Sequence, residues 1–197
     1  MVLAALETLL TSAYDVVGTV SDGRAVVAAA EALQPDVVVL DVGMPLLNGL
    51  DAARQIRQAL PNAKLVFVTM HEDAEVAAEA LRAGASGYVL KRSAAAELIM
   101  AINEALAGRC YITPLAMTGL VDALAHPERG RDPQVALTPR QREILQALSE
   151  GNSMKEVAAR LDITPRTVAF HKYAMMQVLS VKTTAELIRY AIDHHIV

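Results

Sequence analysis

The most constraining feature of the sequence is a run of four apolar residues at 37–40, three of which are β-branched. An uninterrupted apolar run of this length is typical of a strand that is buried on both faces, as in a parallel sheet. The run ends in Asp41, and Gly43 and Pro45 then interrupt the regular backbone. Because reactive groups of open parallel sheets lie just beyond the carboxyl ends of strands, Asp41 is a candidate reactive carboxylate. From this run alone, a carboxylate that only caps the turn is an equally good interpretation.

Strand patterns and helix patterns alternate along the first 107 residues, which predicts a doubly wound parallel α/β sheet. Proline, glycine and aspartate residues mark the boundaries between these elements. We predict strands at 14–20, 37–40, 64–68 and 87–90, and helices at 3–10, 24–33, 48–60, 72–83 and 94–107.

Three polar side chains directly follow predicted strands, namely Asp41, Thr69 and Lys91. Each of them alone is most simply a strand-end residue that meets water. If the three strands are neighbours, however, a carboxylate, a hydroxyl and an ammonium group meet at one edge of the sheet. Such a set could form, hold and sense an acyl phosphate, with Asp41 as nucleophile, Thr69 as hydrogen-bond donor and Lys91 as counter-charge.

The C-terminal part of the chain differs from the first part in charge. Residues 1–137 carry 10 Lys+Arg and 16 Asp+Glu, whereas residues 138–197 carry 8 Lys+Arg and 6 Asp+Glu. An acidic first part and a mildly basic second part indicate two domains with different partners. The net charge of the second part is a weak electrostatic footprint for nucleic-acid binding, so that function needs a motif to support it.

The motif is a run of four predicted helices at 139–150, 154–161, 165–179 and 185–194. A tight turn at Asp162-Ile163 joins the second helix to the third, and Thr164 caps the third. This helix-turn-helix arrangement predicts that the third helix lies in the major groove of duplex DNA. Its expected outer face comprises Arg166, Thr167, Ala169, Phe170, Lys172 and Tyr173, and its inner side comprises Val168, His171, Met175 and Leu179.

Four stretches of the first part carry a resemblance to a known family. They are Asp41 with Met44-Pro45 and Gly49, then 66–69, Ala83-Gly84-Ala85, and 87–91. Together they resemble the receiver domain of two-component response regulators. The resemblance implies that Asp41 accepts phosphate from a histidine kinase and that Lys91 contacts the phosphoryl group. It also implies that Thr69 and Tyr88 form a switch pair that repacks on phosphorylation.

One departure from the receiver family is large. The family begins with an additional strand, central in the sheet, that ends in a pair of acidic residues binding Mg²⁺, whereas this chain begins in the helix that follows. By the resemblance, Asp41 and the backbone carbonyl of Gly43 remain as metal ligands, so we expect weakened Mg²⁺ binding. Three explanations stay open: the two flanking strands pair directly, another chain fills the gap, or Met1 is a mis-assigned start.

The second part is similar to the LuxR-type DNA-binding domain. The matching residues are 137–143, Lys155-Glu156-Val157-Ala158, Thr167-Val168, His171 and Thr184-Ala185-Glu186-Leu187. The resemblance implies a DNA-contacting surface and a dimer interface on the last helix. For the DNA surface we expect Lys155, Thr164, Arg166, Thr167, Ala169, Phe170, His171, Lys172 and Tyr173, with Lys155 and Lys172 as phosphate contacts, and for the interface Leu187, Ile188 and Ala191. Two residues depart from the common pattern: Ala174, where arginine is frequent, and Ser180, where glycine usually follows the third helix.

We therefore interpret the chain as a cytoplasmic transcription regulator with a receiver at 1–108, a helical or flexible linker at 109–136 and a DNA-binding domain at 137–197. Its expected partners are duplex DNA, a histidine kinase and a second copy on DNA, with no membrane span. A single cysteine, Cys110, suits a reducing compartment. Two alternatives remain. One is a degenerate receiver that serves dimerisation without phosphate. The other is a hydrolase that uses Asp41, although a second catalytic acid is lacking there.

Overall fold

The structure is a computed structural model that describes residues 2–125, 137–193 and 196. These residues form two compact units. One comprises the chain up to Met44 together with Gly49–Ala125, and the other comprises Pro45–Asn48 with the C-terminal part. Within the described ranges, no helix is long and apolar enough to span a membrane.

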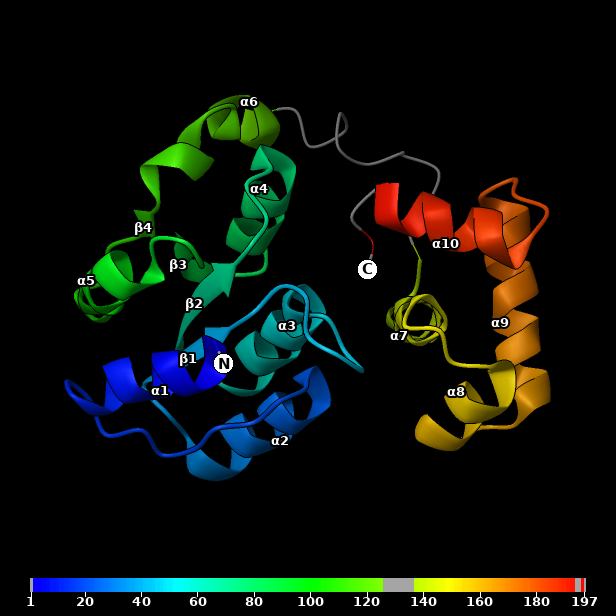
Figure 1. The fold of residues 1–197 in the computed structure, drawn as a ribbon, viewed down its shortest axis with the longest axis horizontal. Helices are drawn as coiled ribbons and strands as arrows, with labels where there is room; N and C mark the ends of the chain where they lie inside the picture. The colour runs from blue at the N-terminus through cyan, green and yellow to red at the C-terminus, as the bar shows by residue number, and fades with distance from the viewer. Residues whose placement is uncertain (1, 126–136, 194–195, 197) are drawn as a thin grey trace. The chain divides into compact units, whose positions relative to one another are not determined.

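The first unit is built on a parallel sheet of four strands in the order β1-β2-β3-β4 (Figure 1). A helix lies between each strand and the next, as parallel pairing requires. The predicted parallel α/β sheet is therefore confirmed, and β1 forms one of its edges. The strands are β1 Val37–Leu40, β2 Lys64–Thr69, β3 Ala85–Leu90 and β4 Tyr111–Ile112.

Helices cover both faces of this sheet, with α1 and α5 on one face and α2, α3 and α4 on the other (Figure 1). Alternate side chains of a strand point to opposite faces. In β2, Val66 and Val68 pack in a buried cluster with Leu98 of α5, whereas Phe67 points to the other face and is fully buried. Two covered faces explain why the strand sequences are apolar without alternation. The helices are α1 Val2–Thr11, α2 Gly23–Leu33, α3 Gly49–Ala59, α4 Ala74–Arg82 and α5 Ala94–Leu106.

The predicted strand at 14–20 is wrong. Residues 15–20 have no regular secondary structure and pair with no strand in the described part of the chain. Side chains fasten this segment near both ends: the Tyr14 hydroxyl donates to Asn103 Oδ1 (2.9 Å), and the Thr19 hydroxyl donates to Glu7 Oε1 (3.3 Å). β-branched content favours a strand only where a partner backbone is available. Direct pairing of this segment with β1, one of the three explanations for the missing family strand, is therefore excluded.

The expected linker at 109–136 is wrong in its first half. Tyr111–Ile112 forms β4 and pairs with β3, and α6, Leu120–Ala125, packs against α4. Residues 112–125 do not form a single helix. They contain a short 3₁₀ helix, η1 Pro114–Met117, followed by α6, because Gly119 adopts a left-handed backbone conformation (φ +78°) between the two. The polar remainder at 126–136 lies outside the described residues.

The second unit contains four helices among its described residues, as predicted. Thr138 and Ser153 each close a capping box, with Gln141 and Glu156 respectively, and Thr164 accepts a hydrogen bond from the Thr167 N–H. These caps fix where three of the helices begin. The helices are α7 Pro139–Ser149, α8 Met154–Arg160, α9 Pro165–Val178 and α10 Thr184–Asp193, and their shared core includes Ile144, Leu145, Val157, Val168, Met175 and Leu187.

Candidate functional site

The carboxyl ends of the three longer strands bring a carboxylate, a hydroxyl residue and an ammonium group together. Asp41 directly follows β1, Thr69 is the last residue of β2, and Lys91 directly follows β3. Lys91 Nζ lies 2.5 Å from Asp41 Oδ2, and the Gly43 N–H lies 3.3 Å from Asp41 Oδ1. Both side chains of the ion pair are partly exposed, at 22% and 30%. The pair is thus strongly held and yet reachable from solvent.

Thr69 and Tyr88 are connected through the backbone of a single residue, His71. The Thr69 hydroxyl oxygen accepts from the His71 N–H (3.2 Å), and the Tyr88 hydroxyl donates to the His71 carbonyl (2.9 Å). Both side chains are fully buried. Burial, reinforced by the charges of Asp73 and Asp41, raises the pKa of the Tyr88 hydroxyl well above its ordinary value, so it remains a hydrogen-bond donor.

Gly49 is required by the turn that carries Asp41. A Cβ atom at this position would lie 1.9 Å from the Asp41 carbonyl oxygen, a contact that no side chain can make. The Gly49 N–H also donates to the Val42 carbonyl (2.8 Å). Gly49 therefore lets the start of α3 pack directly on the backbone of the candidate reactive residue.

The donor set around Asp41 offers a Mg²⁺ ion few protein ligands. Mg²⁺ takes six oxygen ligands in near-octahedral geometry. Here Asp41 Oδ2 contacts the Lys91 ammonium and Oδ1 accepts from the Gly43 amide. Across the described ranges, no group of three or more His, Cys, Asp or Glu side chains could hold a metal. The expected ligands, Asp41 and the Gly43 carbonyl, would leave most positions to water, so weakened Mg²⁺ binding stays a prediction.

In the second unit, α9 presents an exposed surface of mixed character. Arg166, Phe170 and Tyr173 are exposed, with Phe170 at 70%, whereas Val168 and Met175 are buried as predicted. The ring of Phe170 meets that of His171 edge-on, with 5.6 Å between the centroids. Lys155 and Thr164 are also exposed, and Thr167, Ala169 and His171 are partly exposed.

Lys172 does not lie on the predicted outer face of α9. Its exposed fraction is 8%, its Nζ lies 3.3 Å from Thr184 Oγ1, and its ammonium lies 4.7 Å from the centroid of the Tyr173 ring. Helical periodicity explains this position, because Lys172 follows the buried Val168 by four residues and precedes the buried Met175 by three. The same spacing in the sequence was the signal that would have identified it.

Two of the three residues expected at the dimer interface belong to the core of their own unit. Leu187 and Ala191 have exposed fractions of 0%. Ile188 is partly exposed. Ile192, one turn further along α10, is 55% exposed, although it was not among the predicted interface residues. An amphipathic helix at the edge of a small core must use its most apolar stripe internally. The apolar surface that α10 leaves outside therefore centres on Ile188 and Ile192.

The fold and the two sites define a class: a regulator with a receiver-like α/β domain and a helix-turn-helix DNA-binding domain. Residues 1–103 match the model of the response regulator receiver domain, and residues 135–191 match that of the bacterial regulatory proteins of the luxR family. The chain therefore belongs to the response regulators with a LuxR-type DNA-binding domain.

Individual proteins of known name are similar over nearly the whole chain. The transcriptional regulatory protein MctR of Rhizobium johnstonii is 38% identical, covering 98% of this chain and 87% of its own length. The oxygen regulatory protein NreC of Staphylococcus carnosus is 35% identical, with 90% and 85% covered. A structure of the RcsB response regulator of Salmonella typhimurium has a TM-score of 0.64 at 23% identity, covering 98% of this chain and 92% of its own, which supports the shared fold.

Proposed function

We propose that this response regulator is controlled by phosphorylation of Asp41 and that it binds paired DNA half-sites as a homodimer in the cytoplasm. The observation that carries the proposal is the 2.5 Å ion pair between Asp41 and Lys91 at the carboxyl edge of the sheet. A nucleophilic carboxylate and a fixed positive charge are the two groups that acyl phosphate formation most needs from the protein.

The phosphoryl donor is a phosphohistidine of a kinase or a small acyl phosphate. An Asp41 carboxylate oxygen attacks the phosphorus atom. The bond from phosphorus to the donor atom then breaks, and the donor leaves with the bonding electron pair. The Lys91 ammonium, already within 2.5 Å of Asp41, balances the charge that accumulates on the phosphoryl oxygens. The product is an acyl phosphate on Asp41.

The buried contacts of His71 suggest how the modification is sensed. If the Thr69 hydroxyl turns to a phosphoryl oxygen, its hydrogen bond with the His71 N–H is lost. Tyr88 holds the carbonyl of the same residue, so a shift of His71 changes the packing of Tyr88. Thr69 and Tyr88 then respond together because one residue's backbone connects them.

The metal requirement of the family is not met by the described residues of this chain. Two anionic groups approach each other in phosphoryl transfer, and a divalent ion usually neutralises them. Because the described residues offer one carboxylate here and it is paired to Lys91, we expect phosphorylation of Asp41 to be slow and to depend little on Mg²⁺.

DNA binding is assigned to α9 in the major groove, with Lys155 and Arg166 on phosphates and Thr164 and Thr167 at the helix N-terminus. Exposure of these cations and the capped start of α9 support this assignment. Phe170, the most exposed aromatic residue of α9, offers an apolar contact to a thymine methyl group.

Labelling with a small phosphodonor tests the phosphoacceptor directly. The full chain and Asp41→Asn are incubated with acetyl phosphate, with and without Mg²⁺, and the added mass is located by peptide mass spectrometry. We expect slow addition of one phosphate to the wild type at nearly equal rates under both conditions, and none to Asp41→Asn. Fast, stoichiometric labelling only with Mg²⁺ would show that the donor set has been misjudged. Equal labelling of Asp41→Asn would refute Asp41 as the acceptor.

A further inference from the structure

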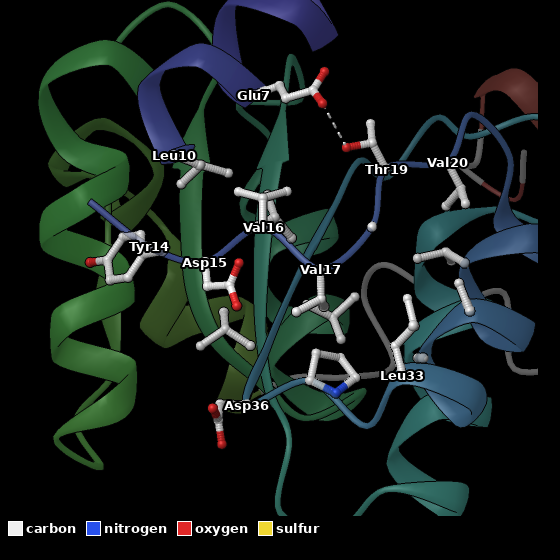
Figure 2. Close-up of a pocket in the computed structure, with 18 of the residues that line it drawn as sticks. Glu7, Leu10, Tyr14, Asp15, Val16, Val17, Thr19, Val20, Leu33 and Asp36 are labelled. Atoms are coloured by element: carbon white, nitrogen blue, oxygen red, sulfur yellow. Dashed lines mark hydrogen bonds between the residues drawn. The ribbon is translucent and has the colours of Figure 1, made fainter. Parts of the chain in front are cut away.

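The two edges of the sheet differ in what borders them. At the β1 edge, a cavity of about 450 Å³ lies between the strand and the segment at 15–20 (Figure 2). At the other edge, β4 pairs with β3, and the chain then continues into η1 (Figure 1). Thr113 lies between β4 and η1, has an exposed fraction of 5% and does not line the cavity. The proposed reaction leaves this buried hydroxyl residue without a role.

Thr113 is bound to β3 on both sides of Val89. Its N–H donates to the Tyr88 carbonyl (2.9 Å), and its hydroxyl oxygen accepts from the Leu90 N–H (3.2 Å). The next rung of the ladder between β3 and β4 would join the Leu90 N–H to the Thr113 carbonyl. That carbonyl instead accepts from the Ala116 N–H (2.9 Å), where η1 begins. The hydroxyl therefore takes the place of a backbone acceptor that the turn into η1 has removed.

Glu97 of α5 fixes the direction of the Thr113 hydroxyl. The hydroxyl donates to Glu97 Oε2 (2.5 Å), and the Glu97 side chain is half-buried. A hydroxyl has one proton to donate, whereas an ionised carboxylate can only accept. The Thr113 proton therefore goes to Glu97, and a lone pair remains for the Leu90 N–H. The two hydrogen bonds support each other, so that a carboxylate on α5 helps to hold the backbone of β3.

The bond to Leu90 bears on Lys91, the next residue. The peptide groups on either side of Leu90 are held from opposite directions, since the Leu90 N–H donates to Thr113 and the Lys91 N–H donates to the Thr69 carbonyl (2.8 Å). From this fixed backbone, the Lys91 side chain reaches Asp41, with 2.5 Å between Nζ and Oδ2. A lysine stem is flexible, so the position of its backbone decides how well the ammonium stays on its partner.

From these contacts we infer that Thr113 is a positioning residue for Lys91. Its hydroxyl, directed by Glu97, holds the end of β3 so that the ammonium stays on the Asp41 carboxylate. The consequence rests on the proposed function: Asp41 takes phosphate faster when the Lys91 charge is already in place. Thr113 acts through the backbone of β3 and not on the phosphoryl group itself.

The test compares variants of the full chain that keep or remove each hydrogen bond. Thr113→Val keeps the branched shape but leaves the buried Leu90 N–H without its acceptor, whereas Thr113→Ser keeps the hydroxyl. Thr118→Val is the matched control, because it makes the same change at an exposed threonine just after η1. Glu97→Gln and Glu97→Ala both remove the charge, but only the first keeps an acceptor. They change a half-buried position, so the test does not depend on the folding of Thr113→Val.

The first readout is the accessibility of the Lys91 amine and needs no phosphate. Each protein is treated briefly with N-acetoxysuccinimide, which acetylates accessible amines, and the rate at Lys91 is followed by peptide mass spectrometry. Lys64, at the start of β2, is the internal reference for the integrity of the sheet. Asp41→Asn, which removes the carboxylate that pairs with Lys91, gives the rate of a released amine.

We expect Thr113→Val to raise the acetylation rate of Lys91 by about threefold relative to Lys64. Glu97→Ala should raise it in the same direction. Thr113→Ser, Glu97→Gln and Thr118→Val should stay close to the wild type, because each keeps the two hydrogen bonds of the Thr113 hydroxyl.

The second readout is the rate at which acetyl phosphate labels Asp41. We expect Thr113→Val to slow this labelling by about threefold to tenfold, because the ammonium is no longer held in place. Thr113→Ser and Thr118→Val should remain within about twofold of the wild type.

An unchanged Lys91 rate in Thr113→Val and Glu97→Ala would overturn the inference. Equal increases at Lys91 and Lys64 would also overturn it, since the hydroxyl would then support the sheet as a whole. So would a Thr113→Ser variant that behaves like Thr113→Val. A released Lys91 with unchanged labelling of Asp41 would refute the effect on the reaction. Failure of the proposed function looks different: the wild type takes no phosphate at Asp41, while the Lys91 rates still decide whether Thr113 positions Lys91.

Discussion

At the scale of single residues, the cations of the second unit divide by exposure. Arg166 is exposed at the start of α9, whereas the Lys172 ammonium is directed to Thr184 and the Tyr173 ring. A phosphate contact requires a reachable charge. Arg166 is therefore expected to contribute to the electrostatic part of DNA binding, and Lys172 mainly to the packing of α9 on α10.

Arg166→Ala should weaken DNA binding by the full chain at all sequences and lower the slope of log affinity against log salt by about one. Lys172→Leu, which keeps an apolar stem at the buried position, should leave that slope unchanged. Fluorescence titrations with duplex DNA at several salt concentrations measure both. A lower slope for Lys172→Leu together with an unchanged slope for Arg166→Ala would reverse the assignment.

The sequence was sufficient to place Asp41, Thr69 and Lys91 at one edge of the sheet, because Asp41 and Lys91 directly follow apolar strands and Thr69 ends one. The spacing of Lys172 from Val168 and Met175 was a usable signal that the prediction did not apply, but the sequence was insufficient for Leu187 and Ala191. A helical stripe can face either the unit's own core or a partner, and only the three-dimensional packing decides which. The link through His71 was equally out of reach, because it is made by backbone groups that any residue carries.

At the scale of elements, the end of α9 carries a conformational cost. Ser180 has φ +54°, a left-handed conformation in which a non-glycine residue is unfavourable. Its N–H donates to the Gln177 carbonyl (3.2 Å), and the Val181 N–H donates to the Met176 carbonyl (3.0 Å). These are the bonds of a Schellman motif, whose turn position is best filled by glycine.

Ser180→Gly should therefore raise the free energy of unfolding of the second unit by about 0.5–1 kcal/mol. Relief of the left-handed strain outweighs the greater entropy that glycine adds to the unfolded chain. Urea unfolding followed by hydrogen exchange in α9 and α10 measures the change, with Ser180→Ala as a control that should stay within about 0.5 kcal/mol of the wild type. A less stable Ser180→Gly variant would contradict this explanation.

The exposed apolar surface of α10 gives a second prediction at this scale. Ile192→Lys should reduce cooperative binding to paired half-sites by about tenfold and spare binding to a single half-site, because it places a charge in the proposed dimer contact. Asp193→Asn makes the same change in net charge on the same helix and should affect neither. Equal losses at paired and single sites for Ile192→Lys would indicate misfolding or a direct role in DNA contact.

At the scale of the whole molecule, alternation of strand and helix patterns correctly predicted the α/β fold, and the capped helices correctly predicted the helix-turn-helix. The segment at 14–20 was predicted wrongly because strand formation depends on a neighbour that local sequence does not reveal. Residues 111–125 were assigned to a linker, since a two-residue strand and a glycine-interrupted helix leave little pattern. Both errors concern segments at the margins of the sheet, where pairing rather than composition decides the structure.

Modification of Asp41 is proposed to control DNA binding by the full chain. The most direct measurement is the affinity of wild type and Asp41→Asn for paired half-sites selected from a random duplex pool, before and after long incubation with acetyl phosphate. We predict that phosphodonor raises the affinity of the wild type and leaves Asp41→Asn unchanged, while both bind a single half-site equally. An identical response of the two proteins would contradict control through Asp41. An unchanged affinity of the wild type after Asp41 has been labelled to completion would contradict it as well.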